Sequence, residues 1–285
     1  MKKTDFRFFH DLRVRWAEVD MQKIVFNAHY LMYIDTAISD YWRALALPYE
    51  QAMVELGGDL YVKKSSLEFH ASARFDDQLE VGMRCSRIGN SSMTFEAGIF
   101  RGEQLLITAE LIYVFADPAT QTSRPVPELL RQCLLGYEAG EPVVEVRTGS
   151  WSAMEADAMK MRIEVFVQEQ LILLEMERDP ADAHCLHAVA YNRLGQPVAT
   201  GRLLPSEAGS ARIGRMAVKR LLRGAGQGAL VLRTLVDAAR QRGDRQVLLH
   251  AQRSAEGFYA RAGFVPQGDG FEEAGLPHIE MVRAV

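Results

Sequence analysis

Hydrophobic positions in the first half of the chain follow a helical period over one long segment. From Asn27 to about residue 45 they recur at the spacing of a helix face: Ala28, Leu31, Ile34, Ile38, Tyr41 and Leu45. Asn27 is a suitable N-cap, so we predict that the helix begins there. Residues 10–17 are compatible with an edge strand, and four later runs have strand character: 60–70, 79–88, 93–101 and 105–115. One long helix followed by consecutive strands predicts an α+β domain with an antiparallel sheet.

Helical and strand patterns alternate in the second half. Residues 151–170 are helical in pattern, and 185–192, 197–204 and 211–218 have strand patterns, with a hairpin turn at 192–195. A helix is expected at 226–242, where Gly243 ends it, and a buried strand at 246–251. Ser254 is a plausible N-cap for a short helix to Ala262, and residues 279–282 form a last strand-like run.

The periodic pattern lapses between residues 136 and 149. Gly136, Gly140 and Pro142 interrupt it, and glutamates are interspersed. We therefore expect two domains, at 1–138 and 148–285, joined by a linker at 139–147.

Composition narrows the class of protein. The 285 residues are 48% apolar and 25% charged, which excludes disorder and suffices for two cores. A net charge of −4 does not favour nucleic acid as a partner. Cys85, Cys133 and Cys185 form no CxxC pair, so neither a zinc knuckle nor a disulfide framework is expected, and we predict no metal. No apolar run could span a membrane and none follows the basic first residues, so we expect no signal peptide and a cytoplasmic protein.

A glycine-rich turn in the second half suggests an anion site. A strand ending in Met216, Ala217 and Val218 leads to a turn and then to the long helix; the turn is formed by Arg223, Gly224, Ala225, Gly226, Gln227, Gly228 and Ala229. The glycines allow backbone N–H groups to converge where the helix dipole is positive, which favours a phosphate or pyrophosphate. The turn lacks the Gly-Lys-Ser/Thr of a Walker A motif and the spacing of the dinucleotide fingerprint. A flexible loop before a helix is the alternative interpretation.

This turn and its surroundings resemble the GNAT acetyltransferases. The segment Arg223-x-x-Gly226-x-Gly228 is similar to that family's acyl-CoA pyrophosphate motif, and residues 257–264 are similar to its FYxxxGF helix and turn. Residues 165–170 and 271–278 resemble one bacterial branch, so the resemblance covers roughly 145–285. It implies an α/β domain with a mixed sheet and flanking helices.

The GNAT resemblance also implies site residues. Met216, Ala217 and Val218 would offer backbone groups to the pantetheine arm, and residues 223–229 would hold the pyrophosphate. Tyr259 would lie near the CoA sulfur and protonate the departing thiolate as general acid; without the motif, a core tyrosine is the simpler interpretation. The base for the acceptor amine stays open among Glu164, Glu169, Glu177 and His187, each of which could instead be a solvated charge or a core side chain.

A carboxylate in the first half lies just before the long helix. A strand leads to Asp20, about seven residues before Asn27. Such a carboxylate can attack a thioester carbonyl or activate water, and free N–H groups at a helix start can stabilise the oxyanion. Taken alone, an aspartate in this position is more often a turn residue than a catalyst.

Residues 5–135 resemble the hotdog-fold acyl-CoA thioesterases of the 4-hydroxybenzoyl-CoA thioesterase family. The family pattern of Asp-x-x-Gly, Ile or Val, Val, an aromatic and a helix start is seen here from Asp20 to Tyr30. Lys23 stands where the family usually has Gly, and Asn27 where many members have His. The resemblance implies that Asp20 is the catalytic carboxylate, that the backbone N–H near Asn27 contributes to an oxyanion hole, and that the protein forms a homodimer or larger oligomer.

Both resemblances imply acetyl-CoA or another acyl-CoA as substrate and an unknown amine as acceptor. Three hypotheses follow. The chain is a bifunctional thioesterase and N-acyltransferase; or one domain is catalytic and the other binds acyl-CoA or mediates oligomerisation; or the second half resembles acyl-homoserine-lactone synthases and consumes S-adenosylmethionine, which the intact pyrophosphate motif disfavours.

Overall fold

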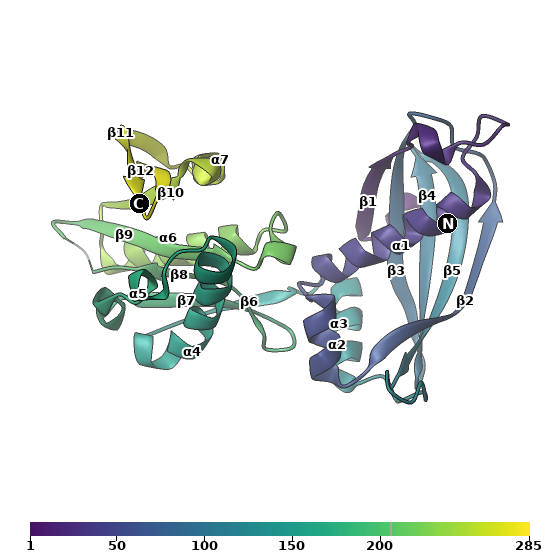
Figure 1. Cartoon of the computed structure of the whole chain (residues 1–285), viewed down its shortest axis with the longest axis horizontal. Helices are drawn as coiled ribbons and strands as arrows, with labels where there is room; N and C mark the ends of the chain where they lie inside the picture. Colours follow the sequence, from purple (N-terminus) through teal and green to yellow (C-terminus); the bar gives the residue numbers. More distant parts are fainter. Residues whose placement is uncertain (206) are drawn as a thin grey trace. The chain divides into compact units, whose positions relative to one another are not determined.

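Two compact units make up the chain in this computed structural model, which describes residues 1–205 and 207–285 (Figure 1). The first unit comprises Met1–Val143 and the second Val144–Val285. No helix in the described ranges is long and apolar enough to cross a membrane.

The first unit is an antiparallel sheet with a long helix packed against it. The sheet order is β1-β3-β4-β5-β2, and the strands are β1 (Phe8–Arg13), β2 (Asp59–Phe69), β3 (Gln78–Ile88), β4 (Ser92–Arg101) and β5 (Gln104–Ala116). Helix α1 (Asn27–Ala44) crosses the sheet (Figure 1). It buries the face that its period predicts: Tyr30, Tyr33, Ile34, Ala37, Ile38, Tyr41 and Trp42. The predicted α+β class is confirmed, and the arrangement is the hotdog fold.

Several local predictions for this unit were wrong. Phe26, not Asn27, is the N-cap of α1; Asn27 is the first helical residue, and no side chain caps the helix. The first strand ends at Arg13, and a 3₁₀ turn follows at Trp16–Glu18. Helices α2 (Tyr49–Leu56) and α3 (Glu128–Glu138) were not predicted, because each spans at most three turns and shows the period only briefly.

The second unit is a mixed sheet of seven strands with helices packed on it. The sheet order is β11-β12-β10-β9-β8-β7-β6. The strands are β6 (Val144–Gly149), β7 (Leu186–Asn192), β8 (Pro197–Leu203), β9 (Ser210–Val218), β10 (Gln246–Gln252), β11 (Val265–Glu273) and β12 (Leu276–Ala284). Helices α4 (Trp151–Arg162) and α6 (Gln227–Arg242) both pack on β7 and β8. Strand β8 is buried along its whole length, as a central strand covered on both faces would be.

The second unit also departs from the predictions. Strand β6 begins at Val144, inside the expected linker, and pairs with β7. The helix predicted at 151–170 changes at Ile163 into a π-helix, Ile163–Glu169, and a short helix α5 (Leu174–Glu177) follows. Ser254 is not an N-cap: it lies in a 3₁₀ turn, Arg253–Ala255, and Ala255 caps α7 (Glu256–Arg261). Strand β11 was missed because it is polar and exposed along nearly its whole length.

Candidate active sites

A cavity in the second unit opens where two neighbouring strands separate. Parallel pairing of β9 with β10 stops at Ile213 and Leu249, although β9 continues to Val218. Beyond that point β9 carries a bulge, because Arg215 and Met216 together oppose the single residue Gly201 of β8. Arg215 has φ +53°, the left-handed conformation that such a bulge imposes. The bulge bends β9 away from β10 and leaves room between them.

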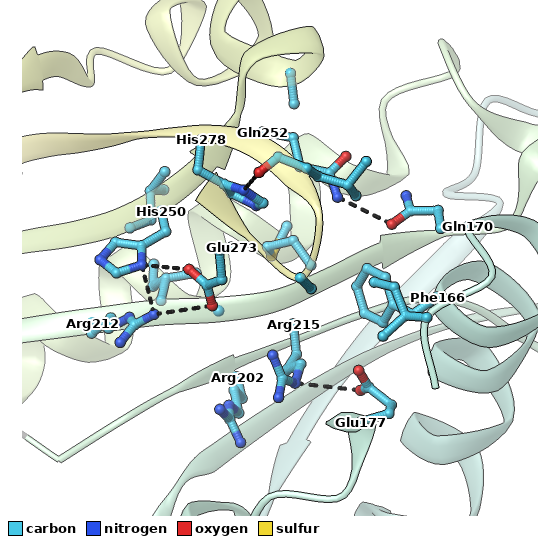
Figure 2. Close-up of a pocket in the computed structure, with 18 of the residues that line it drawn as sticks. Phe166, Gln170, Glu177, Arg202, Arg212, Arg215, His250, Gln252, Glu273 and His278 are labelled. Atoms are coloured by element: carbon cyan, nitrogen blue, oxygen red, sulfur yellow. Dashed lines mark hydrogen bonds and ion pairs between the residues drawn. The ribbon is translucent and has the colours of Figure 1, made fainter. Parts of the chain in front are cut away.

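The cavity has a volume of about 170 Å³. Figure 2 labels charged and imidazole side chains that line it: Glu177, Arg202, Arg212, Arg215, His250, Glu273 and His278. The phenol of Tyr259 lines it as well. One water occupies roughly 10–15 Å³ of such space, so a small molecule can enter it.

Tyr259 lies in the wall of this cavity on α7. Its ring packs against Phe258 and Phe264, at centroid distances of 4.9 and 6.1 Å. Burial raises the pKa of Tyr259 to about 12, so the hydroxyl keeps its proton at neutral pH. It makes no hydrogen bond to any residue that the structure describes. A core tyrosine normally has a bonded hydroxyl, so this group is available to a ligand.

The glycine-rich turn has the open geometry that an anion needs. Gly224 and Gly226 have φ +87° and +92°, and Gly226 is the N-cap of α6. A Cβ at either glycine would meet no atom within 4 Å, so the space over the turn is unobstructed. The side chain of Arg223, however, is already engaged. Its two terminal nitrogens donate to Glu169 at 2.6 and 2.7 Å, and its Nε donates to the Val218 carbonyl at 3.2 Å.

The sequence candidates for a base are nearly all paired with cations. Glu164 accepts from Lys219 at 2.6 Å, and Glu169 from Arg223. Glu177 lines the cavity but is buried and bonded to Arg162.

His187 is also unsuited to act as the base. It is buried, and its Nε2–H donates to the Asp182 carbonyl at 2.9 Å. Burial lowers the pKa of the imidazole. Of the four candidates only Glu177 lines the cavity, and its carboxylate is held by Arg162.

A histidine–glutamate pair in the cavity wall was missed by sequence analysis. Glu273 Oε2 lies 2.8 Å from His250 Nδ1, and Arg212 Nη2 lies 2.9 Å from the same nitrogen. An Nδ1–H that donates to Glu273 cannot also accept from Arg212, so we assign the hydrogen bond to the contact with Glu273. Burial opposes ionisation of Glu273, but the hydrogen bond with His250 and the charges of His250 and Arg212 together outweigh it and hold the pKa of the carboxyl below its usual value. The two residues come from β10 and β11, 23 positions apart. An alternation of apolar and polar residues along β11 would have predicted this strand and its pairing. The alternation is absent because β11 is exposed along nearly its whole length.

In the first unit, Asp20 lies in a tight loop just before α1. Val19 and Val25 form an isolated β-bridge, and the Asp20 N–H donates to the Ile24 carbonyl at 2.9 Å. Asp20 Oδ1 accepts from the Gln22 N–H at 2.7 Å, so one carboxylate oxygen closes the turn. Lys23 has φ +63°, the conformation that glycine would favour at this position.

The start of α1 lies next to this loop. The Phe26 N–H donates to the Glu18 carbonyl at 2.9 Å, which ties the helix start to the segment before Asp20. Asn27 is exposed, and as the first helical residue it has a backbone N–H without a carbonyl one turn back.

A second carboxylate in this region, Glu18, is buried. It accepts from the Tyr33 hydroxyl and the Arg15 N–H, both at 2.7 Å. Burial opposes its ionisation, yet these hydrogen bonds keep the pKa of Glu18 below its usual value. Glu18 is therefore a structural anchor of the loop, and Asp20 is the carboxylate with an oxygen left over.

Comparisons with known proteins agree with both folds. The sequence profile of the acetyltransferase (GNAT) domain family matches residues 153–285, and that of the thioesterase superfamily matches residues 22–108. The chain is thus a fusion of two acyl-CoA-related classes, with a thioesterase-superfamily hotdog domain first and a domain that belongs to the GNAT acetyltransferase family second. Both families use acyl-CoA substrates.

Individual relatives match one half of the chain each. The uncharacterized N-acetyltransferase YjcF of Bacillus subtilis is 34% identical over 45% of this chain and 90% of its own length. The structure of an acyl-CoA N-acyltransferase from Pseudomonas aeruginosa is 31% identical, over 50% of this chain and 99% of that one, with a TM-score of 0.45. Slr0204, a 1,4-dihydroxy-2-naphthoyl-CoA thioesterase from Synechocystis, is 18% identical, over 45% of this chain and 95% of that one, with a TM-score of 0.42.

Proposed function

We propose that this chain is a bifunctional acyl-CoA enzyme, in which the first unit hydrolyses a thioester and the second transfers the acyl group from CoA to an amine. The main support for acyl transfer by the second unit is the unbonded Tyr259 hydroxyl, which lies in a cavity where β9 and β10 separate. The open glycine turn after the same strand supports it.

In the second unit, the pyrophosphate of acyl-CoA would bind the backbone N–H groups of residues 224–229 at the positive end of α6. The pantetheine arm would run along Met216–Val218, where β9 no longer pairs with β10. Arg223 would act chiefly by holding the turn against Glu169, since its guanidinium is already bonded there.

The acyl transfer itself needs one base and one acid. The His250–Glu273 pair would take a proton from the acceptor ammonium, with the ionised Glu273 stabilising the imidazolium that forms. The free amine then attacks the thioester carbonyl, and the C–S bond breaks as the amide forms. Tyr259 would donate its proton to the leaving CoA sulfur and recover one from the nitrogen side through solvent.

In the first unit, the free oxygen of Asp20 would attack the thioester carbonyl or activate a water. The backbone N–H groups at the start of α1, near Asn27, would stabilise the oxyanion. The bond from the Gln22 N–H to Asp20 favours a second candidate for this unit, a module that binds acyl-CoA without turnover, because it stabilises the carboxylate in a purely structural role.

We also propose that the first unit forms a homodimer through β2. This strand is at the edge of its sheet, is 11 residues long and exposes Tyr61, Val62 and Phe69. Long exposed edges with apolar side chains are rare in monomers. Analytical ultracentrifugation of the full chain should give a dimer, and Val62→Pro on that edge should dissociate it.

A free-thiol assay tests the bifunctional proposal. The intact protein should release CoA from acyl-CoA without an acceptor, and an amine should add a second, acceptor-dependent rate. Asp20→Ala should abolish the first rate only, and Tyr259→Phe should lower the second by about 10²-fold or more. Acceptor-independent release that survives Asp20→Ala would support the binding-module alternative for the first unit.

A further inference from the structure

Three arginines and three carboxylates meet below the cavity of the second unit. Two of the arginines hold the carboxylates firmly. Arg162 pairs with Glu177 and bonds both oxygens of Asp182 at 3.0 Å. Arg202 bonds Asp182 at 2.6 Å and also pairs with Asp179.

Arg215 is the third arginine, and its charge is met only loosely. Its Nε lies 3.3 Å from Glu177 Oε1 without hydrogen-bond geometry, and its Nη2 lies 3.7 Å from Asp179. Its one hydrogen bond within the described ranges reaches the Met176 carbonyl at 3.5 Å, the limit for such a bond. The three carboxylates it could use are already bonded to Arg162 and Arg202.

The pKa values of Arg202 and Arg215 reflect this difference. Burial opposes the charge of Arg202, but hydrogen bonds to Asp179 and Asp182 raise its pKa above the usual value. Burial lowers the pKa of Arg215, and its ion pairs do not make up the difference. Arg215 is thus a partly buried cation whose two ion pairs are loose, and it lines the cavity.

A different side of the cavity presents groups that suit an ammonium ion. In the view of Figure 2, Arg215, Arg202 and Glu177 lie at the bottom, and Glu273, His250 and Arg212 lie at the left. Glu273 is ionised and bonded to His250. Arg212 Nη2 lies 4.0 Å from Glu273 Oε1. The Arg212 side chain is 41% exposed, so solvent screens its interaction with this carboxylate.

On one side of the cavity lies Arg215, whose anionic partners are already bonded to other arginines, and on the other side lies a carboxylate–imidazole pair. The two sides complement a zwitterion. We propose that the cavity binds an acceptor that carries a carboxylate as well as the amine that is acylated. Arg215 binds the carboxylate, and the ammonium group faces His250 and Glu273. This inference rests on the acyl transfer proposed above and names its substrate class: free amino acids and related amino acids with a longer spacing between the two groups.

The reaction balances with this orientation. The acceptor ammonium gives one proton to His250, its nitrogen forms a bond to the thioester carbon, and the C–S bond breaks. The second nitrogen proton is lost as the amide forms, and the CoA sulfur takes up one proton. The carboxylate on Arg215 is unchanged, so it serves only to bind and orient the acceptor.

The test compares acceptors that differ only in the carboxylate. Thiol release from acetyl-CoA is measured with full-length Asp20→Ala protein, which lacks the proposed hydrolysis. The acceptors are α-amino acids with their carboxamides, and β-alanine and 4-aminobutyrate with theirs, so that the best spacing is also found. The acid should exceed its amide in kcat/KM by about 10- to 100-fold, mostly through KM, as for one charged hydrogen-bonded contact.

Variants at Arg215 then assign the effect. Arg215→Gly keeps the positive φ of the bulge and removes the guanidinium, so the acid-to-amide ratio should fall to within about threefold of one. Arg215→Lys keeps the charge and should retain part of the preference. Arg240→Ala, on the exposed face of α6, is the matched control and should leave the ratio unchanged. Thermal melting and CoA binding report whether each variant is folded.

The outcomes are distinct. Equal use of acids and amides, or a preference that survives in folded Arg215→Gly protein, overturns the zwitterion assignment while leaving acyl transfer standing. If Arg215→Gly does not fold, Arg215→Asn replaces it, because asparagine tolerates a positive φ and carries no charge, and an undiminished preference there overturns the assignment equally. Failure of every amine to accelerate thiol release overturns the proposed transfer itself, and this inference with it.

Discussion

Removal of the Asp182 carboxylate should destabilise the second unit strongly. Asp182 is 2% exposed and accepts from Arg162 at 3.0 Å and from Arg202 at 2.6 Å. In Asp182→Ala both guanidinium groups stay buried with one fewer anion. Breaking a buried pair costs about 3–5 kcal/mol. Because Glu177 and Asp179 still pair with the two arginines, we expect the lower end, about 3 kcal/mol.

Urea unfolding followed by Trp151 fluorescence measures this loss. Trp151 is well placed as a reporter: its ring lies 5.4 Å from the Arg162 guanidinium and 4.7 Å from His187. The other two tryptophans, Trp16 and Trp42, are in the first unit and are replaced by Phe in the reference and variant proteins alike.

The control is Asp237→Ala, which removes an exposed partner of Arg240 and should cost less than about 0.5 kcal/mol. A loss below about 1 kcal/mol for Asp182→Ala would refute the reasoning, because the cluster would then contribute no more than a surface pair.

Three further predictions concern single groups. Lys23→Gly should stabilise the first unit by about 0.5–1 kcal/mol, since glycine adopts φ +63° without strain. The control Lys160→Gly, inside α4, should destabilise the second unit by about 1 kcal/mol, and equal effects of the two variants in calorimetry would contradict this. Burial opposes ionisation of Asp179, but its pKa in the folded protein is lowered, chiefly by the hydrogen bond from Arg202. The ionised Asp179 therefore stabilises the fold fully above the pKa of the unfolded chain, near 3.8, and this stabilisation is lost as the pH falls through the lower pKa of the folded protein. Acid unfolding of Asp179→Asn should accordingly depend less on pH below about 4 than that of the unaltered protein, and an unchanged slope would count against it. Because the pKa of Tyr259 is about 12, acceptor-dependent thiol release should show no loss from tyrosine ionisation between about pH 8 and 10, and a titration there that disappears in Tyr259→Phe would disprove the assignment.

The elements that sequence predicted well are those whose period is long and one-sided. Helix α1 repeats its apolar spacing over 18 residues, and the strands of both sheets are bounded by clear turns. The π-helix at Ile163–Glu169 and the strand β11 were missed for physical reasons. A change from α to π hydrogen bonding leaves no signature in the apolar pattern, and β11 has almost no buried side chain to mark it.

The candidate sites were predictable only where a local motif exists. The glycine turn and Tyr259 lie in short motifs that can be recognised in the sequence. The pairing of His250 with Glu273 depends on a strand order, and the exposure of Arg215 to the cavity depends on a bulge in β9. Similarly, sequence alone gave no sign that Arg223 is bonded to Glu169, 54 positions earlier.

Calorimetric titration with a non-hydrolysable thioether analogue of acetyl-CoA tests most directly the claim that each unit binds acyl-CoA. The full chain should bind two molecules. Gly226→Val should reduce the number to one, because a β-branched residue does not tolerate φ +92° and its side chain would fill the open space over the turn. A single site in the unaltered protein, or two sites that persist in Gly226→Val, would contradict the account.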